Sequence, residues 1–95
     1  MKAFQSFKED SSGTEAFSIT FENGNTISVV FGKGTYSDQG ETTAEVAAWD
    51  SNGDWMLFQD GAWITIKQDS EVMPRCTPTE VAEMMFALSM LPKNN

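Results

Sequence analysis

The side chains that most often carry out catalysis or bind metal ions are scarce in this sequence of 95 residues. It has no histidine, which removes the usual general base near neutral pH and the commonest metal ligand. The single cysteine, Cys76, stands just before the start of an expected helix, a position that can lower the pKa of a thiol. With no histidine to act as its base, we do not expect Cys76 to be a catalytic nucleophile. The sequence therefore predicts no catalytic residues, no metal site and no cofactor.

A glycine-rich segment, residues 32–37 (Gly-Lys-Gly-Thr-Tyr-Ser), is the one place where a small phosphorylated ligand is conceivable. Glycines let backbone N–H groups approach an anion, and a lysine adds positive charge. The candidate ligand-binding residues are Lys33, Gly34, Thr35 and Tyr36. The segment lacks the full P-loop spacing and no helix pattern follows it, so the alternative is a plain connection between strands.

Residues 50–54 (Asp-Ser-Asn-Gly-Asp) are rich in the oxygen ligands that calcium prefers. An EF-hand loop has glycine at its sixth position and glutamate at its twelfth, whereas here glycine is fourth and the twelfth residue is Gly61. The flanking residues also alternate as strands do. A hairpin turn is the better interpretation.

Alternation of apolar and polar residues predicts strands over residues 15–22, 26–31, 43–50, 55–58 and 62–67. Short turn sequences join them: Asn23-Gly24-Asn25, residues 50–54, and Asp60-Gly61. We expect loops at residues 32–41 and at the crossing 68–75. Residues 1–8 fit neither the strand period nor the helix period, and residues 1–14 form an N-terminal segment to which the sequence assigns no structure.

A helix is predicted over residues 77–91. Thr77 suits the N-cap, Pro78 the first helical position, and Glu80 completes a capping box three residues after the cap. Pro92 ends the run, and an apolar stripe should cover the sheet: Val81, Met84, Met85, Leu88 and Leu91. Residues 1–95 are thus expected to form one α+β domain, an antiparallel β-meander of about five strands with one C-terminal helix packed on a face.

The tryptophans give the best indication of a binding surface, because Trp49, Trp55 and Trp63 fall on three successive strands. If Ala44, Val46, Ala48, Ile64 and Ile66 pack inward, Trp49 and Trp63 face outward, near Tyr36. Exposed tryptophans gather where proteins bind, since they give a large contact area at a small entropic cost. The alternative is that they form a second small core beneath the N-terminal segment.

A second apolar row on the helix, Ala82, Phe86 and Met90, lies off the stripe that should face the sheet. A helix that is apolar nearly all round is usually buried on both sides. One interpretation is self-association through this row as a two-fold dimer. The other is that residues 1–8 fold over it.

The chain carries 14 acidic and 6 basic residues, a net charge of −8. This charge argues against direct binding to a nucleic-acid backbone. Solubility is the usual role of such charge, and the alternative is that the carboxylates mimic phosphates on a basic partner. The first ten residues lack the apolar run of a secretion signal, and no run approaches the ~18 apolar residues of a membrane helix, so we expect a cytoplasmic protein without a membrane partner.

Three segments in order resemble small uncharacterised accessory proteins encoded by tailed bacteriophages: residues 17–36 (FSITFENGNTISVVFGKGTY), 44–55 (AEVAAWD followed by GDW) and 77–82 (TPTEVA). The resemblance implies a compact accessory protein made in the cytoplasm of an infected host cell. Proteins of that class frequently counter host defences or redirect host enzymes. The resemblance assigns no catalytic residue.

The leading hypothesis is a non-enzymatic binding protein that inhibits a host immune or nucleic-acid-processing protein. Two alternatives are a sponge that sequesters a small nucleotide signal and a minor component of the virion or its assembly. The net charge of −8 disfavours the sponge unless Lys33, Lys67 and Arg75 converge. An enzyme that uses carboxylates such as Asp38, Asp50 and Asp54 ranks last.

Overall fold

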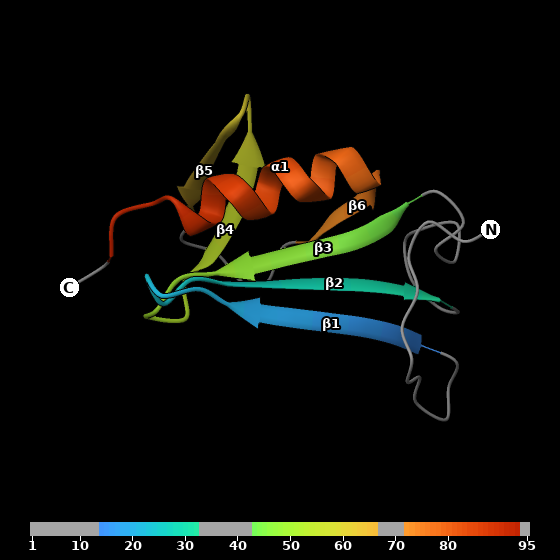
Figure 1. Cartoon of the computed structure of the whole chain (residues 1–95), viewed down its shortest axis with the longest axis horizontal. Coiled ribbons are helices and arrows are strands. Elements are labelled where there is room, and N and C mark those ends of the chain that lie inside the picture. Colours follow the sequence, from blue (N-terminus) through green and yellow to red (C-terminus); the bar gives the residue numbers. More distant parts are fainter. Residues whose placement is uncertain (1–13, 33–42, 67–71, 94–95) are drawn as a thin grey trace.

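The structure, a computed structural model, describes residues 14–32, 43–66 and 72–93. This part of the chain forms, in order, β1 (Thr14–Thr20), β2 (Thr26–Gly32), β3 (Ala44–Trp49), β4 (Trp55–Gln59), β5 (Ala62–Thr65), β6 (Met73–Cys76) and α1 (Pro78–Ser89). All strand pairs are antiparallel, and β1 to β5 are neighbours in sequence order (Figure 1). The expected α+β fold, a meander of five strands with a C-terminal helix, is confirmed.

The sixth strand, β6, was not expected, because residues 68–75 were interpreted as a loop crossing. It pairs with β3 through Ala44 and Cys76 and through Val46 and Met73, with a register shift between the two pairs. Pro74 cannot donate a ladder hydrogen bond, and Arg75 has a φ of 58°. These two residues interrupt the alternation by which a strand is recognised in a sequence.

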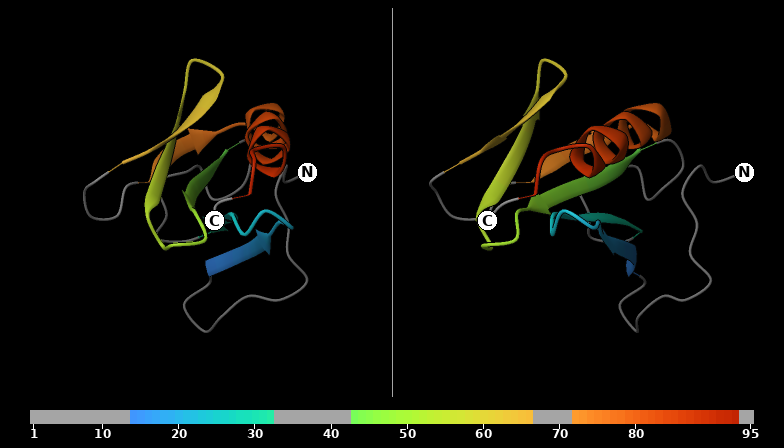
Figure 2. Two further views of the ribbon diagram at one scale, coloured as in Figure 1. Left: turned by 90° about the vertical axis from the view of Figure 1, so that its left-hand side faces the viewer. Right: turned by 60° about the vertical axis from the view of Figure 1, so that its left-hand side comes forward.

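One edge of β3 therefore has two partners. Its N-terminal half pairs with β6, and its C-terminal half pairs with β4 through Ala48 and Met56 and through Trp49 and Trp55. Beyond these pairs the β4–β5 hairpin leaves the sheet and rises beside α1 (Figure 2). The helix consequently contacts both the β1–β3 part of the sheet and the hairpin.

The core lies between α1 and the face of the sheet that it covers. Alternate residues of β2 and β3 supply half of its buried apolar residues, and the burial of β3 alternates strictly along the strand. The fully buried strand residues are Ile27, Val29, Phe31, Ala44, Val46 and Ala48. The predicted helix stripe is confirmed: Val81, Met84 and Leu88 are buried, and Met85 and Leu91 pack against the core.

Both ends of α1 are capped by side chains. The predicted capping box is confirmed, since Thr77 Oγ1 accepts from the Glu80 N–H at 3.2 Å and Glu80 Oε1 accepts from the Thr77 N–H at 2.9 Å. At the other end, Asn23 Nδ2 donates to the carbonyl oxygens of Leu88 at 2.8 Å and Leu91 at 3.0 Å. The β1–β2 turn thus satisfies carbonyl groups that a helix end leaves without an internal partner.

Within the residues that the structure describes, α1 is too short to cross a lipid bilayer, and no other segment forms a helix that could.

Candidate functional site

Trp63 lies in the core, so the expectation that it faces outward is wrong. Its side chain is 8% exposed, and its indole Nε1 donates a hydrogen bond of 2.9 Å to the backbone oxygen of Met84 in α1. Trp63 pairs with Phe58 of β4, and the two rings are 5.2 Å apart. Because alternate residues share a face of a strand, this register places Ile64 on the other side.

The expectation that Ile64 packs inward is wrong for the same reason, since Ile64 is 43% exposed. Ile66, also expected inward, is only partly buried. Alternation in β5 separates Trp63 and Thr65 from the two isoleucines, but it does not say which set faces the core. The face with the indole is covered because one large ring buries much area and its N–H finds an acceptor on the helix.

Trp49 lies on the face opposite the helix, as expected, and is half-buried. It pairs with Trp55 across β3 and β4, and the two ring centroids are 5.4 Å apart with their planes at 60°. The rings cover part of each other's surface. Trp49 therefore offers a smaller contact area than an isolated exposed indole, and its role in binding stays a prediction.

The other candidate ligand residues, Lys33, Gly34, Thr35 and Tyr36, lie outside the described residues. The hypothesis of a phosphate site in that segment stays a prediction. The alternatives that depend on residues 1–8 also lie outside the described part of the chain.

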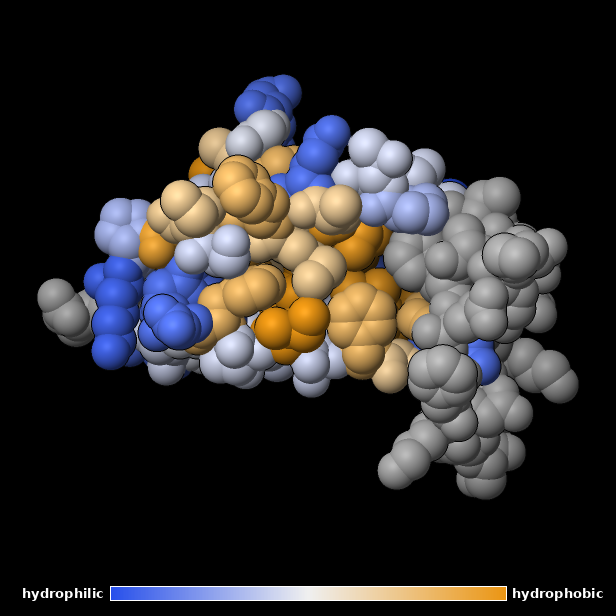
Figure 3. Space-filling view, viewed as in Figure 1, coloured by the Kyte–Doolittle hydropathy of each residue, from blue (hydrophilic) through white to orange (hydrophobic). Residues whose placement is uncertain are grey.

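The second apolar row of the helix, Ala82, Phe86 and Met90, is exposed. Phe86 and Met90 are 69% and 68% exposed, the highest values among the large apolar side chains of the described residues. Phe17 of β1 is 39% exposed and pairs with Val29, which places it on the same side of the sheet as the helix. Apolar side chains gather over α1 and the neighbouring part of the sheet on this side of the molecule (Figure 3). We call Phe17, Ala82, Phe86 and Met90 the apolar surface.

A pocket of about 250 Å³ lies where α1, β4 and β6 meet, and we call it the β6 pocket. Its apolar lining comes from Phe58, Met73, Pro74 and Met84, and Cys76, Glu80 and Glu83 complete it. Burial, and secondarily the negative charge of Glu80, raises the pKa of Cys76 from 9.0 to about 11. Cys76 is therefore a protonated thiol at neutral pH, and the lowering of its pKa considered from the sequence does not occur.

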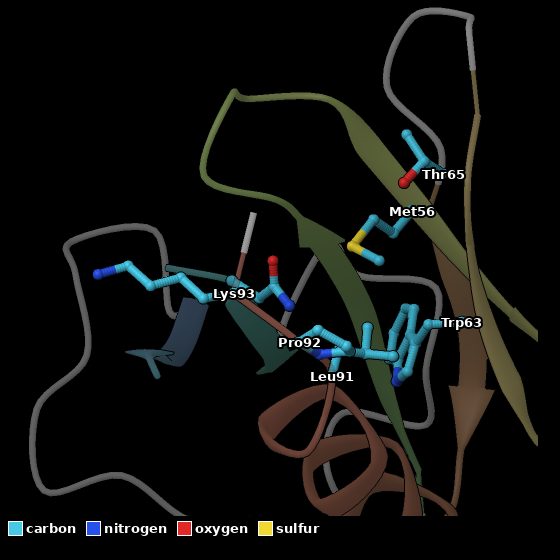
Figure 4. A pocket seen from close by; sticks show the side chains of 7 residues that line it. Met56, Trp63, Thr65, Leu91, Pro92 and Lys93 are labelled. Atoms are coloured by element: carbon cyan, nitrogen blue, oxygen red, sulfur yellow. The ribbon is translucent and has the colours of Figure 1, made fainter. Parts of the chain in front are cut away.

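A second pocket, of about 240 Å³, lies near the C-terminal end of α1 (Figure 4). It is lined by Asn25, Met56, Trp63, Thr65, Leu91, Pro92 and Lys93. The ammonium group of Lys93 points away from Met56 and Trp63 (Figure 4). The cation and the apolar wall therefore do not meet at one ligand position.

The predicted hairpin turn at residues 50–54 is confirmed. Asp50 Oδ1 accepts hydrogen bonds from the backbone N–H groups of Asn52 at 2.9 Å and Asp54 at 3.0 Å. The carboxylate thus stabilises the turn itself, as aspartates at this position commonly do. Across residues 14–32, 43–66 and 72–93, no group of three or more cysteine, aspartate or glutamate side chains is arranged to hold a metal ion.

Sequence reasoning missed the β6 pocket and the buried asparagines Asn23 and Asn25, which are 7% and 3% exposed. Both asparagines were interpreted only as turn formers. One signal was present: residues 90–92 (Met-Leu-Pro) offer no glycine or asparagine to end the helix, so its last carbonyls need donors from elsewhere. The β6 pocket had no such signal, because it depends on the pairing of β6 with β3.

Comparison with known proteins assigns no family to the chain. No protein-family model, no curated protein and no solved structure matches it.

Proposed function

We propose that the chain is a non-enzymatic binding protein that attaches to another protein through the apolar surface. The observation that carries this proposal is the exposure of Phe86 and Met90, at 69% and 68%, on a helix whose opposite side is buried in the core. Large apolar side chains gathered on one side of a small domain mark a contact site, because burying them against a partner releases water. Phenylalanine and methionine are also enriched at protein interfaces.

The charge of the chain indicates the chemistry of the partner. A net charge of −8 attracts a basic protein and repels a second copy of this chain as well as a nucleic acid. We therefore assign the apolar surface to a basic protein partner, ahead of the two-fold dimer that the sequence also allows.

The resemblance to phage accessory proteins supports a more specific proposal. The partner would be a host immune or nucleic-acid-processing protein, and binding would inhibit it in the host cytoplasm. A basic surface that normally holds a nucleic acid is the kind of site that an acidic protein of this size can cover.

The test compares the native chain with the double variant Phe86→Ser, Met90→Ser. Each protein is used to capture partners from host extract, and the affinity for the purified partner is then measured. We expect the double variant to lose at least about tenfold in affinity, because truncating a central apolar anchor usually costs more than 1 kcal/mol.

The matched control is Ile64→Ser, which removes an exposed apolar side chain from β5, away from the apolar surface. This variant should bind as the native chain does. Equal losses in both variants, or no loss in either, would overturn the proposal. Sedimentation of the free chain gives a second check: a dimer that the double variant dissociates would assign the surface to self-association instead.

A further inference from the structure

The walls of the β6 pocket are fixed by contacts among its lining residues and with Trp63, which packs behind them. The Phe58 backbone N–H donates to the Met73 sulfur at 3.5 Å, and the Phe58 ring packs on Trp63. Trp63 in turn donates to the backbone oxygen of Met84 at 2.9 Å. These contacts join β4, β5, β6 and α1 around one space of about 250 Å³, so the pocket exists before any ligand enters it.

The lining divides into an apolar wall and an acidic one. Two thioethers, an aromatic ring and a proline ring form the apolar wall, and both acidic residues, Glu80 and Glu83, come from α1. The capping box holds the Glu80 carboxylate in place through the Thr77 N–H. Within residues 14–32, 43–66 and 72–93, no hydrogen bond or ion pair engages the side-chain carboxylate of Glu83.

We propose that the β6 pocket is a subsite for the side chain of a lysine or arginine from a basic protein partner. The aliphatic stem of such a side chain would lie along Met73, Met84 and Phe58, and its charged end would meet Glu80 and Glu83 at the mouth. Long basic side chains have this division into an apolar stem and a charged head. This inference deepens the proposed function and rests on it, since the partner must be a protein.

Two further observations agree with this occupant. The net charge of −8 favours a cationic partner over an anionic one. Cys76 lines the same pocket, and its pKa is raised by burial and secondarily by the negative charge of Glu80. The negative potential of the Glu80 carboxylate therefore extends into the pocket. An aromatic ring such as that of Phe58 is also a favourable neighbour for a cationic side chain.

The test follows the ε-methyl signals of the methionines by NMR while a short peptide, acetyl-Ala-Ala-Lys-Ala-Ala-amide, is added. Met73 and Met84 report on the β6 pocket, and Met56, which lines the other pocket, reports on unspecific binding. We expect saturable shifts at Met73 and Met84 with a dissociation constant on the order of millimolar, as for one side chain on a small site. The same peptide with norleucine in place of lysine has the same stem without the charge, and it should bind at least about tenfold more weakly.

Glu83→Gln should weaken binding of the lysine peptide roughly fivefold or more, because a charge-assisted contact is lost. The control is Glu22→Gln, which removes the same charge from an exposed turn outside the pocket lining and should have little effect. Absence of saturable shifts, equal binding of the norleucine peptide, or an unchanged affinity in Glu83→Gln would each overturn the inference.

The two proposals fail separately. Phe86→Ser, Met90→Ser should leave peptide binding in the β6 pocket intact, since neither residue lines it. Suppose that the pocket does not bind the lysine peptide, while the double variant still has a lower affinity for the protein partner. The subsite proposal is then wrong and the proposed function is supported. If the pocket binds the peptide while the double variant binds the partner with unchanged affinity, the apolar surface is not the contact site.

Discussion

The indole Nε1 of Trp63 lies 2.9 Å from the backbone oxygen of Met84 and donates a hydrogen bond to it. This bond joins the β4–β5 hairpin to α1, which lies outside the sheet and is held to the hairpin by side-chain contacts. The hairpin leaves the sheet after Met56, so its attachment to the rest of the molecule depends strongly on this bond and on the contact of the Phe58 N–H with the Met73 sulfur of β6, at 3.5 Å.

Trp63→Phe should lower the free energy of unfolding by about 1–2 kcal/mol. The substitution keeps an aromatic ring in the core but removes the N–H donor and some buried area. Urea unfolding followed by circular dichroism measures the effect. Trp55→Phe is the control, because Trp55 is half-buried on the opposite face, and it should cost less than about 1 kcal/mol. Equal losses in the two variants would contradict the structural role of Trp63.

Much of the fold could be predicted from the sequence because local rules act on it strongly. Strict alternation in β2 and β3 identifies their buried face, and the Thr77–Glu80 spacing identifies the start of α1. The face that β5 buries could not be predicted in this way. The alternating pattern of β5 is the same whether Trp63 or Ile64 faces the core. Only the position of the helix decides which of the two is buried.

The candidate site was predictable only in part. The exposed row of α1 follows from helical periodicity, since Phe86 and Met90 lie four residues apart on the side away from Leu88. The β6 pocket was not predictable, because a four-residue strand that contains Pro74 carries no alternation. Contacts between residues far apart in sequence create it.

Asn23→Asp should lower the free energy of unfolding by about 2–4 kcal/mol. The substitution keeps the shape of the side chain but replaces the Nδ2 donor with a carboxylate oxygen facing the carbonyls of Leu88 and Leu91. Asn52→Asp adds the same charge at an exposed turn position and should change stability by less than about 0.5 kcal/mol. Thermal and urea unfolding of the two variants give the comparison, and similar stabilities would show that Asn23 does not cap the helix.

Cys76 should react slowly with thiol reagents in the folded protein. Burial and Glu80 raise its pKa from 9.0 to about 11. At pH 8 the thiolate fraction is then roughly 100-fold lower than in the unfolded chain, and burial slows access further. Labelling with iodoacetamide in buffer and in guanidinium chloride measures the ratio. Equal rates under native and denaturing conditions would contradict the buried, protonated thiol.

The same raised pKa makes the stability depend on pH. Below about pH 9 the thiol is protonated in both states, so its contribution is fully present. Between pH 9 and 11 the unfolded chain gives up the proton first, and the free energy of unfolding falls. Cys76→Ala should not show this part of the loss. The difference between the native chain and this variant, measured by urea unfolding at pH 8 and pH 10.5, isolates the effect from other groups that titrate there.

Gly24→Ala should destabilise the protein far more than Gly53→Ala, although both glycines have a positive φ, 88° and 84°. A Cβ at Gly24 would lie 2.7 Å from the Cβ of Ser51, whereas at Gly53 nothing lies within 4 Å. Gly53→Ala should therefore cost only the left-handed strain, about 1–2 kcal/mol, and Gly24→Ala about 3 kcal/mol or more.

Ser51→Gly removes the opposing Cβ, so the cost of Gly24→Ala in that background should fall to the level of Gly53→Ala. Urea unfolding of the single and double variants completes the cycle. Strict additivity would mean that the β1–β2 and β3–β4 turns do not touch. A coupling of 1 kcal/mol or more, on the order expected for residues in contact, would establish that the turn which caps α1 is itself held by its neighbour.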